Sequence, residues 1–128
     1  MSPIKVFISF DYENDLDIKK NFIKQSERLT STLKIVDVSI NQPITEKWKE
    51  EARRKIQNSD YVIVLCGEHT HEAKGVAAEI TIAQELNKKY ILIKGRRSKA
   101  ISKPQNTKDS DQIISWKWKT IESIIMKL

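Results

Sequence analysis

The densest group of chemically reactive side chains lies in the segment Cys66–Glu79 (CGEHTHEAKGVAAE). Its residues of metal-binding type are Cys66, Glu68, His69, His71 and Glu72. Their spacing matches neither the HExxH motif nor a paired CxxC motif, so a metal site is the weaker interpretation. A histidine pair in such a polar loop is more often exposed to solvent or in contact with a bound ligand, and we expect ligand contact for His69.

Glu79 is the second candidate for chemistry. It follows Val76 by three residues and directly precedes Ile80, at the edge of the apolar stripe of a predicted helix. A carboxylate there can stabilise the positive charge that develops on a sugar ring when its glycosidic bond breaks. The alternative is a surface glutamate that faces a lysine, and helix periodicity by itself favours this alternative.

Several common catalytic motifs are absent from the chain. GxGxxG, GxxxxGK[ST] and GxSxG do not occur, which argues against Rossmann dinucleotide binding, P-loop phosphoryl transfer and nucleophile-elbow hydrolysis. The single cysteine, Cys66, excludes an intramolecular disulfide framework and a zinc ribbon. No apolar run approaches the ~20 residues that cross a bilayer, and no signal-peptide segment is evident, so we expect a cytoplasmic protein without membrane contact.

The positive charge is concentrated near the C-terminus. The formal net charge is +6, and from Gly95 onward eight Lys and Arg stand against three Asp and Glu, which accounts for +5 of it. Nucleic-acid binding is therefore the weaker explanation of the basic balance. Arg96 and Arg97 follow a predicted strand, where we expect them to attract nucleotide phosphates.

Hydrophobic patterns predict the elements that must position these residues. Strands are predicted over 5–10, 34–40, 61–66, 90–94 and, at the sheet edge, 113–114. Helices are predicted over 15–33, from a Thr45 cap through Ile56, over 75–88 and over 116–128. The run 61–66 is apolar throughout and is expected to be central and covered on both faces.

Alternating strands and helices predict a single α/β domain over residues 1–128, a flavodoxin-like three-layer α/β/α sandwich with a four- to five-stranded parallel sheet. Such sheets bind ligands beyond the carboxyl ends of their strands, which directs attention to residues 9–12, 39–42, 67–74 and 95–97. Asp37, inside an apolar strand, either faces that crevice or is a structural carboxylate, and both interpretations stay open.

These segments, in this order, resemble the Toll/interleukin-1 receptor (TIR) superfamily, and most closely the TIR-like proteins of the Thoeris anti-phage system. The resemblance spans about residues 4–94. The residues that carry it are VFISFDY (6–12) followed by Asp15 or Asp17, VDVSI (36–40), Ser59 and Asp60 before YVIVLCG (61–67), Thr70, and Glu79.

The resemblance implies an enzyme that cleaves the nicotinamide–ribose bond of NAD and makes a nucleotide second messenger in prokaryotic defence. NAD is then the substrate, and no separate cofactor is expected. The implied catalytic residue is Glu79. The implied substrate-binding residues are Phe10, Asp11, Tyr12, Asp37, Ser39, Gly67 and Thr70. The implied partners are a second copy of the chain and a separate effector reached through the diffusible signal.

One position departs from the family pattern. Many relatives have Trp four residues before the glutamate, and this chain has Gly75 there. Stacking of nicotinamide from that point is therefore absent. Two alternatives to NAD cleavage stay open: a non-catalytic TIR-like module that senses a nucleotide or acts as a scaffold, and a nucleoside (deoxy)ribosyl-transfer enzyme on the same fold.

Overall fold

The computed structural model describes residues 4–29, 35–37, 47–97 and 100–126. Its strands form one sheet in the order β2-β1-β3-β4-β5, and all neighbouring strands are parallel. The strands are β1 (Ile4–Ser9), β2 (Ile35–Asp37), β3 (Tyr61–Cys66), β4 (Tyr90–Lys94) and β5 (Ile113–Ile114). The parallel α/β sheet that the sequence predicts is confirmed, including the short edge strand β5.

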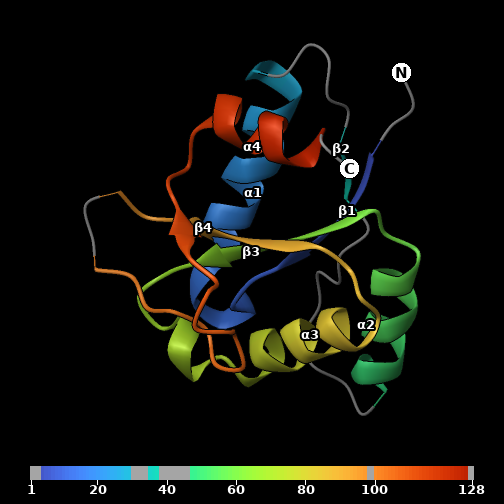
Figure 1. Cartoon of the computed structure of the whole chain (residues 1–128). Helices are drawn as coiled ribbons and strands as arrows, with labels where there is room; N and C mark the ends of the chain where they lie inside the picture. Colours follow the sequence, from blue (N-terminus) through green and yellow to red (C-terminus); the bar gives the residue numbers. More distant parts are fainter. Residues whose placement is uncertain (1–3, 30–34, 38–46, 98–99, 127–128) are drawn as a thin grey trace.

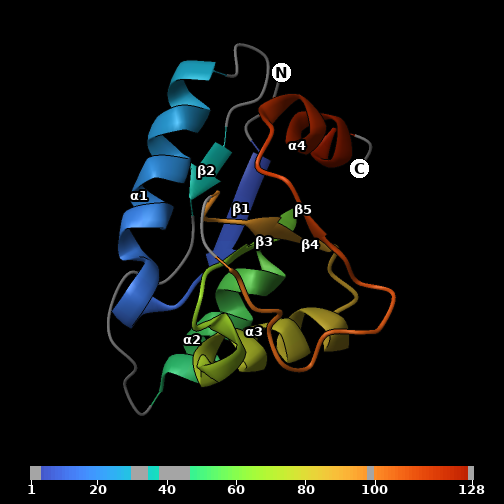
Figure 2. The same cartoon turned by 90° about the vertical axis from the view of Figure 1, so that its left-hand side faces the viewer.

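Helices cover both faces of this sheet (Figures 1 and 2). Helices α1 and α4 pack on one face, and α2 and α3 pack on the other. Their bounds, with those of a short 3₁₀ helix η1 between β3 and α3, are α1 (Tyr12–Leu29), α2 (Trp48–Gln57), η1 (Thr70–Glu72), α3 (Lys74–Glu85) and α4 (Trp118–Ile125). The three-layer architecture is thus the flavodoxin-like one.

Strand β3 lies at the centre of the sheet, and every one of its residues is buried. Ile63 and Leu65 pack into the core beside α1 and α4, whereas Val62 and Val64 pack into the core beside α2 and α3. Successive side chains of a strand point to opposite faces, so a strand covered on both sides must be apolar at every position. This is the physical basis of the uninterrupted apolar run.

Several helix boundaries differ from the predicted ones, and α3 ends at Glu85 rather than at 88 because Asn87 takes a left-handed backbone conformation with φ 56°. Helix α1 begins at Tyr12 rather than at 15, because the Asp11 carboxylate accepts a hydrogen bond from the Glu13 backbone N–H at 3.2 Å and so caps the chain earlier. Asp15 lies at a kink, with φ −124° and ψ 20°. Helix α4 begins at Trp118 rather than at 116, because Lys117 has an extended backbone. The predicted Thr45 cap lies outside the described residues.

The segment after β4 crosses the outside of η1 and α3. The Ser102 backbone N–H donates to the Gly67 carbonyl at 2.9 Å, and the Gln105 side-chain amide donates to the His71 carbonyl at 2.7 Å. The Asn106 amide donates to the carbonyl of Ala77 at 3.1 Å. These bonds fix the loop that follows β3, which is the loop with the reactive side chains. Within the described ranges, every helix is too short or too polar to cross a membrane.

Candidate active site

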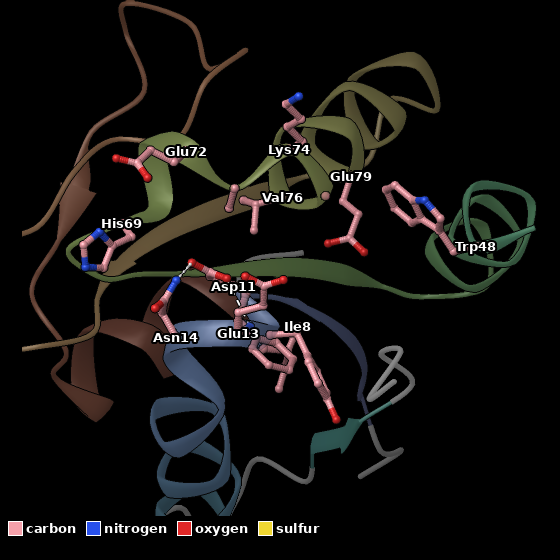
Figure 3. A pocket seen from close by; sticks show the side chains of 14 residues that line it. Ile8, Asp11, Glu13, Asn14, Trp48, His69, Glu72, Lys74, Val76 and Glu79 are labelled. Atoms are coloured by element: carbon pink, nitrogen blue, oxygen red, sulfur yellow. Dashed lines mark hydrogen bonds between the residues drawn. The ribbon is translucent and has the colours of Figure 1, made fainter. Parts of the chain in front are cut away.

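A cavity of about 530 Å³ lies at the carboxyl end of β1. Its walls come from four places: the end of β1, the first turn of α1, the start of α2 at Trp48, and the segment from His69 to Glu79. Figure 3 shows side chains from these elements turned toward a common space. The size falls within the range of small-molecule sites, ~300–1,000 Å³, and the position agrees with the rule for parallel sheets.

Glu79 forms the inner part of this cavity. It is 9% exposed and comes from α3, on the face that also buries Val76 and Ile80. The hydroxyl of Ser9, the last residue of β1, donates a hydrogen bond to Glu79 Oε1 at 2.6 Å. Ser9 points to the α3 side of the sheet because it lies two residues after Phe7, which packs in the core on that side. The expectation of an exposed glutamate facing a lysine is wrong.

Burial raises the pKa of Glu79 to about 8, and the hydrogen bond from Ser9 offsets only part of that rise. The carboxyl group is therefore mostly protonated at neutral pH. A positive charge that enters the cavity lowers this pKa again, because an opposite charge nearby favours the ionised form. The protonation state of Glu79 therefore depends on the charge of the ligand.

The segment that joins β1 to the first turn of α1 provides the second wall, which includes Phe10, Asp11 and Tyr12. The Asn14 side-chain amide donates to Asp11 Oδ2 at 2.7 Å, while Asp11 Oδ1 caps the helix. Phe10 and Tyr12 lie with ring centroids 6.3 Å apart and planes tilted by 38°. All three residues expected at the substrate thus line the cavity, and Asp11 also holds the turn in place.

The loop after β3 brings only one of its expected residues to the cavity. His69 is exposed and lines it, whereas Gly67 and Thr70 are buried and lie outside its lining. The Thr70 hydroxyl oxygen accepts a hydrogen bond from the Gly67 backbone N–H at 2.7 Å. Gly67 and Thr70 therefore fix the shape of the loop from within. Asp37 ends β2 and its side chain is not described, and Ser39 lies outside the described residues.

Arg96 does not take the role expected for it. Its guanidinium donates to Asp17 at 3.0 and 3.1 Å, to Asp15 Oδ1 at 3.2 Å and to the Asn14 carbonyl at 3.1 Å. Its charge is thus neutralised by two carboxylates, and it does not line the cavity. The sequence-based expectation that Arg96 attracts nucleotide phosphates is wrong, because two carboxylates already pair with its guanidinium. The sequence pattern could not reveal this ion pairing, since it joins residues about 80 positions apart. Arg97 is exposed.

The metal hypothesis gains no support from the geometry. Over the described ranges, no group of three or more His, Cys, Asp or Glu side chains is placed to share a metal ion. His71 Nε2 lies 3.2 Å from the carboxylate of Glu72, and both side chains are largely exposed. Cys66 is buried, and burial raises the pKa of its thiol to about 12.

Sequence reasoning assigned no role to several residues of the cavity. The hydrogen bond between Ser9 and Glu79 could have been inferred, because Ser9 is a polar residue in an otherwise apolar strand. Trp48 begins α2 and lines the cavity. The remaining polar lining residues without an assigned role are Glu13, Asn14 and Lys74, and Glu72 was considered only as a metal ligand. Exposed residues of this kind give no periodic signal.

Comparison with known proteins agrees with this architecture. The model of the family described as Thoeris protein ThsB, TIR-like domain, matches residues 7–100. A crystal structure of a prokaryotic SEFIR domain superposes with a TM-score of 0.54 at 18% sequence identity, covering 97% of this chain and 88% of that one. No curated protein matches the sequence.

The SEFIR likeness supports the fold alone because its sequence identity is low. The family match carries more weight, since it covers most of the chain and runs from β1, through Glu79, to beyond β4. This chain belongs to the family of TIR-like domains of the Thoeris protein ThsB.

Proposed function

We propose that the protein cleaves the bond between nicotinamide and ribose in NAD, with Glu79 as the catalytic carboxylate. The observation that carries the proposal is a buried carboxyl group that faces a cavity of ligand size and has only a neutral hydroxyl, that of Ser9, as its hydrogen-bond partner among the described residues. Such a carboxyl group can stabilise a positive charge that forms transiently on a substrate in the cavity.

The chemistry follows from charge. In NAD the pyridinium ring carries a positive charge, and heterolysis moves the bonding pair to the ring nitrogen. Neutral nicotinamide leaves and the positive charge passes to the ribose as an oxocarbenium ion. Glu79, ionised in the presence of the cationic substrate, stabilises that charge. Water or a hydroxyl group of a nucleotide then bonds to the sugar carbon and gives up its proton to the solvent, and the second outcome gives a cyclic or conjugated nucleotide.

The rim of the cavity supports binding of the remainder of the dinucleotide. Lys74 is exposed, lines the cavity and begins α3. Within the part of the chain that the structure describes, no side chain caps the start of this helix, at Ala73. A lysine and the partial positive charge of a helix N-terminus both favour a phosphate group. We place the pyrophosphate at the rim and the nicotinamide ribose inside.

The biological role that we propose follows from the family. The product is a nucleotide signal in anti-phage defence, sensed by a separate effector protein, and the active form includes a second copy of this chain. These proposals rest on the family relationship and on the cavity, and each requires the cleavage reaction.

The test measures the release of nicotinamide from NAD by chromatography. It is carried out with the protein alone and with lysate of infected cells added. We expect release by the wild type and a loss of about 100- to 1,000-fold in Glu79→Gln, as when a group that stabilises transition-state charge is removed. Glu85→Gln, on the same helix but exposed, is the matched control and should retain full activity. If wild type and Glu79→Gln are equally inactive under every trigger, a non-catalytic nucleotide-sensing module replaces this proposal.

A further inference from the structure

Three aromatic side chains line the cavity: Phe10, Tyr12 and Trp48. The rings of Phe10 and Tyr12 pack against each other, and Phe10 is only 8% exposed. Trp48 is half-buried and, within the described part of the chain, has no aromatic neighbour and no acceptor for its indole N–H. In Figure 3 its indole comes from α2, on the side of the cavity where Glu79 lies.

The helix pattern explains why this ring is in the cavity. Ala52 and Ile56 follow Trp48 at intervals of four residues and are fully buried against the sheet. Residues four apart share one face of a helix, so Trp48 continues the buried face of α2. It is one turn closer to the helix start, and there the ring lines the cavity as well as touching the core.

The charges around the cavity favour a cation. Four carboxyl groups line it, and the only lysine or arginine in the described lining is Lys74. The acidic residues are Asp11, Glu13, Glu72 and Glu79. A flat aromatic face also attracts cations, with Trp the strongest of the side chains. Together these features select a planar, positively charged ring over a neutral one of the same shape.

We propose that Trp48 is the specificity-determining residue of the cavity and receives the pyridinium ring of oxidised NAD on its indole face, a role that rests on the proposed function. Reduced NAD, whose nicotinamide ring is uncharged, is bound less tightly at this position. Cleavage of the bond between the sugar carbon and the ring nitrogen leaves the bonding pair on nitrogen, so nicotinamide becomes neutral. It then loses its attraction to Trp48 and departs.

The direct test uses ring fragments that cannot be cleaved because they carry no ribose. 1-Methylnicotinamide is cationic, whereas nicotinamide has the same ring without the charge. The Trp116→Phe/Trp118→Phe variant leaves Trp48 as the only indole, since the chain has three tryptophans. We expect 1-methylnicotinamide to quench the fluorescence of Trp48 and to bind about tenfold more tightly than nicotinamide. Equal affinities, or no binding of either fragment, would overturn the proposal.

Substitutions at Trp48 complete the test, with affinities measured by calorimetry on the otherwise native chain. Trp48→Phe keeps an aromatic face and should retain most of the preference for the cationic fragment, whereas Trp48→Leu should abolish it. Trp118→Phe is the control, because that ring packs against Phe22 in the opposite core. An unchanged preference in Trp48→Leu would refute the role of Trp48.

The two proposals fail separately. Selective fragment binding without NAD cleavage by the wild type would contradict the proposed reaction and leave the role of Trp48 in cation binding intact. Cleavage lost in Glu79→Gln, together with equal fragment affinities, would support the reaction and overturn the role of Trp48.

Discussion

Glu79 and Asp15 are both buried acidic side chains at the carboxyl edge of the sheet, and their surroundings are opposite. Glu79 faces the cavity and accepts a hydrogen bond from the neutral hydroxyl of Ser9. Asp15 faces protein: Arg96 donates to its Oδ1 at 3.2 Å, and among the described residues its Oδ2 has no hydrogen-bond partner. A β-carbon added to Gly67 would lie 2.4 Å from the Asp15 carboxylate, so the protein packs tightly there.

The difference teaches how the same residue type serves two purposes. Burial raises the pKa of Asp15, but the hydrogen bond and charge of Arg96 counteract it; for Glu79 only the Ser9 hydroxyl counteracts burial. Arg96 also donates to the Asn14 carbonyl, so the Asp15–Arg96 pair ties the end of β4 to the first turn of α1, which lines the cavity. Asp15 thus stabilises the wall, whereas Glu79 is available to a ligand.

Arg96→Ala should give the largest loss of stability. It leaves Asp15 buried without its cation, which costs about 3 kcal/mol, and the melting temperature should fall by roughly 10 °C. Thermal denaturation measures this. Arg97→Ala is the matched control. Arg97 is the exposed neighbour of Arg96, so its substitution should change the melting temperature by less than ~2 °C. Equal effects of the two substitutions would show that Asp15 and Arg96 do not form a stabilising pair.

In contrast to the Asp15–Arg96 pair, the ionised carboxyl group of Glu79 should lower the stability of the folded protein. Because its pKa is about 8 in the folded protein and near 4.5 when unfolded, the folded state binds an extra proton between these values. The wild type should therefore lose stability relative to Glu79→Gln as the pH rises from about 5 to about 8, by roughly 3–4 kcal/mol, and change little above about pH 9.

Melting temperatures of both proteins over this pH interval provide the measurement. Glu85→Gln, which replaces an exposed glutamate on the same helix, is measured in parallel as the control. A constant difference between wild type and Glu79→Gln would contradict the raised pKa of Glu79.

Ser9→Ala should give the smallest effect. The substitution removes the hydrogen bond that favours the ionised form of Glu79, so the pKa of Glu79 should rise further. The pH–rate profile of NAD cleavage should shift upward by about half a pH unit, with activity at pH 7 reduced about threefold. Ser59→Ala removes a buried hydroxyl that donates to the Ile56 carbonyl and should leave the profile unchanged. An unshifted profile in Ser9→Ala would argue against the coupling to Glu79.

Much of the fold could be predicted because burial leaves a periodic signal. The bounds of β3, β4 and β5 agree with the apolar runs, and the helices were found at their expected places along the chain. The start of α1 could not be predicted, because it depends on how the Asp11 carboxylate caps the turn. Among the loop residues, sequence pattern did not separate His69, which faces the cavity, from Thr70, which is buried beneath it.

The sequence by itself determined the order of the elements, the parallel sheet and the edge at which a ligand can bind, because hydrophobic periodicity and strand connectivity are local or nearly local properties. Only the tertiary structure decided what the charged residues do. The contact between Ser9 and Glu79 joins residues 70 positions apart, and that between Asp15 and Arg96 joins residues 81 positions apart. The pKa of a carboxyl group depends on burial and on neighbours of this kind, which no local pattern encodes.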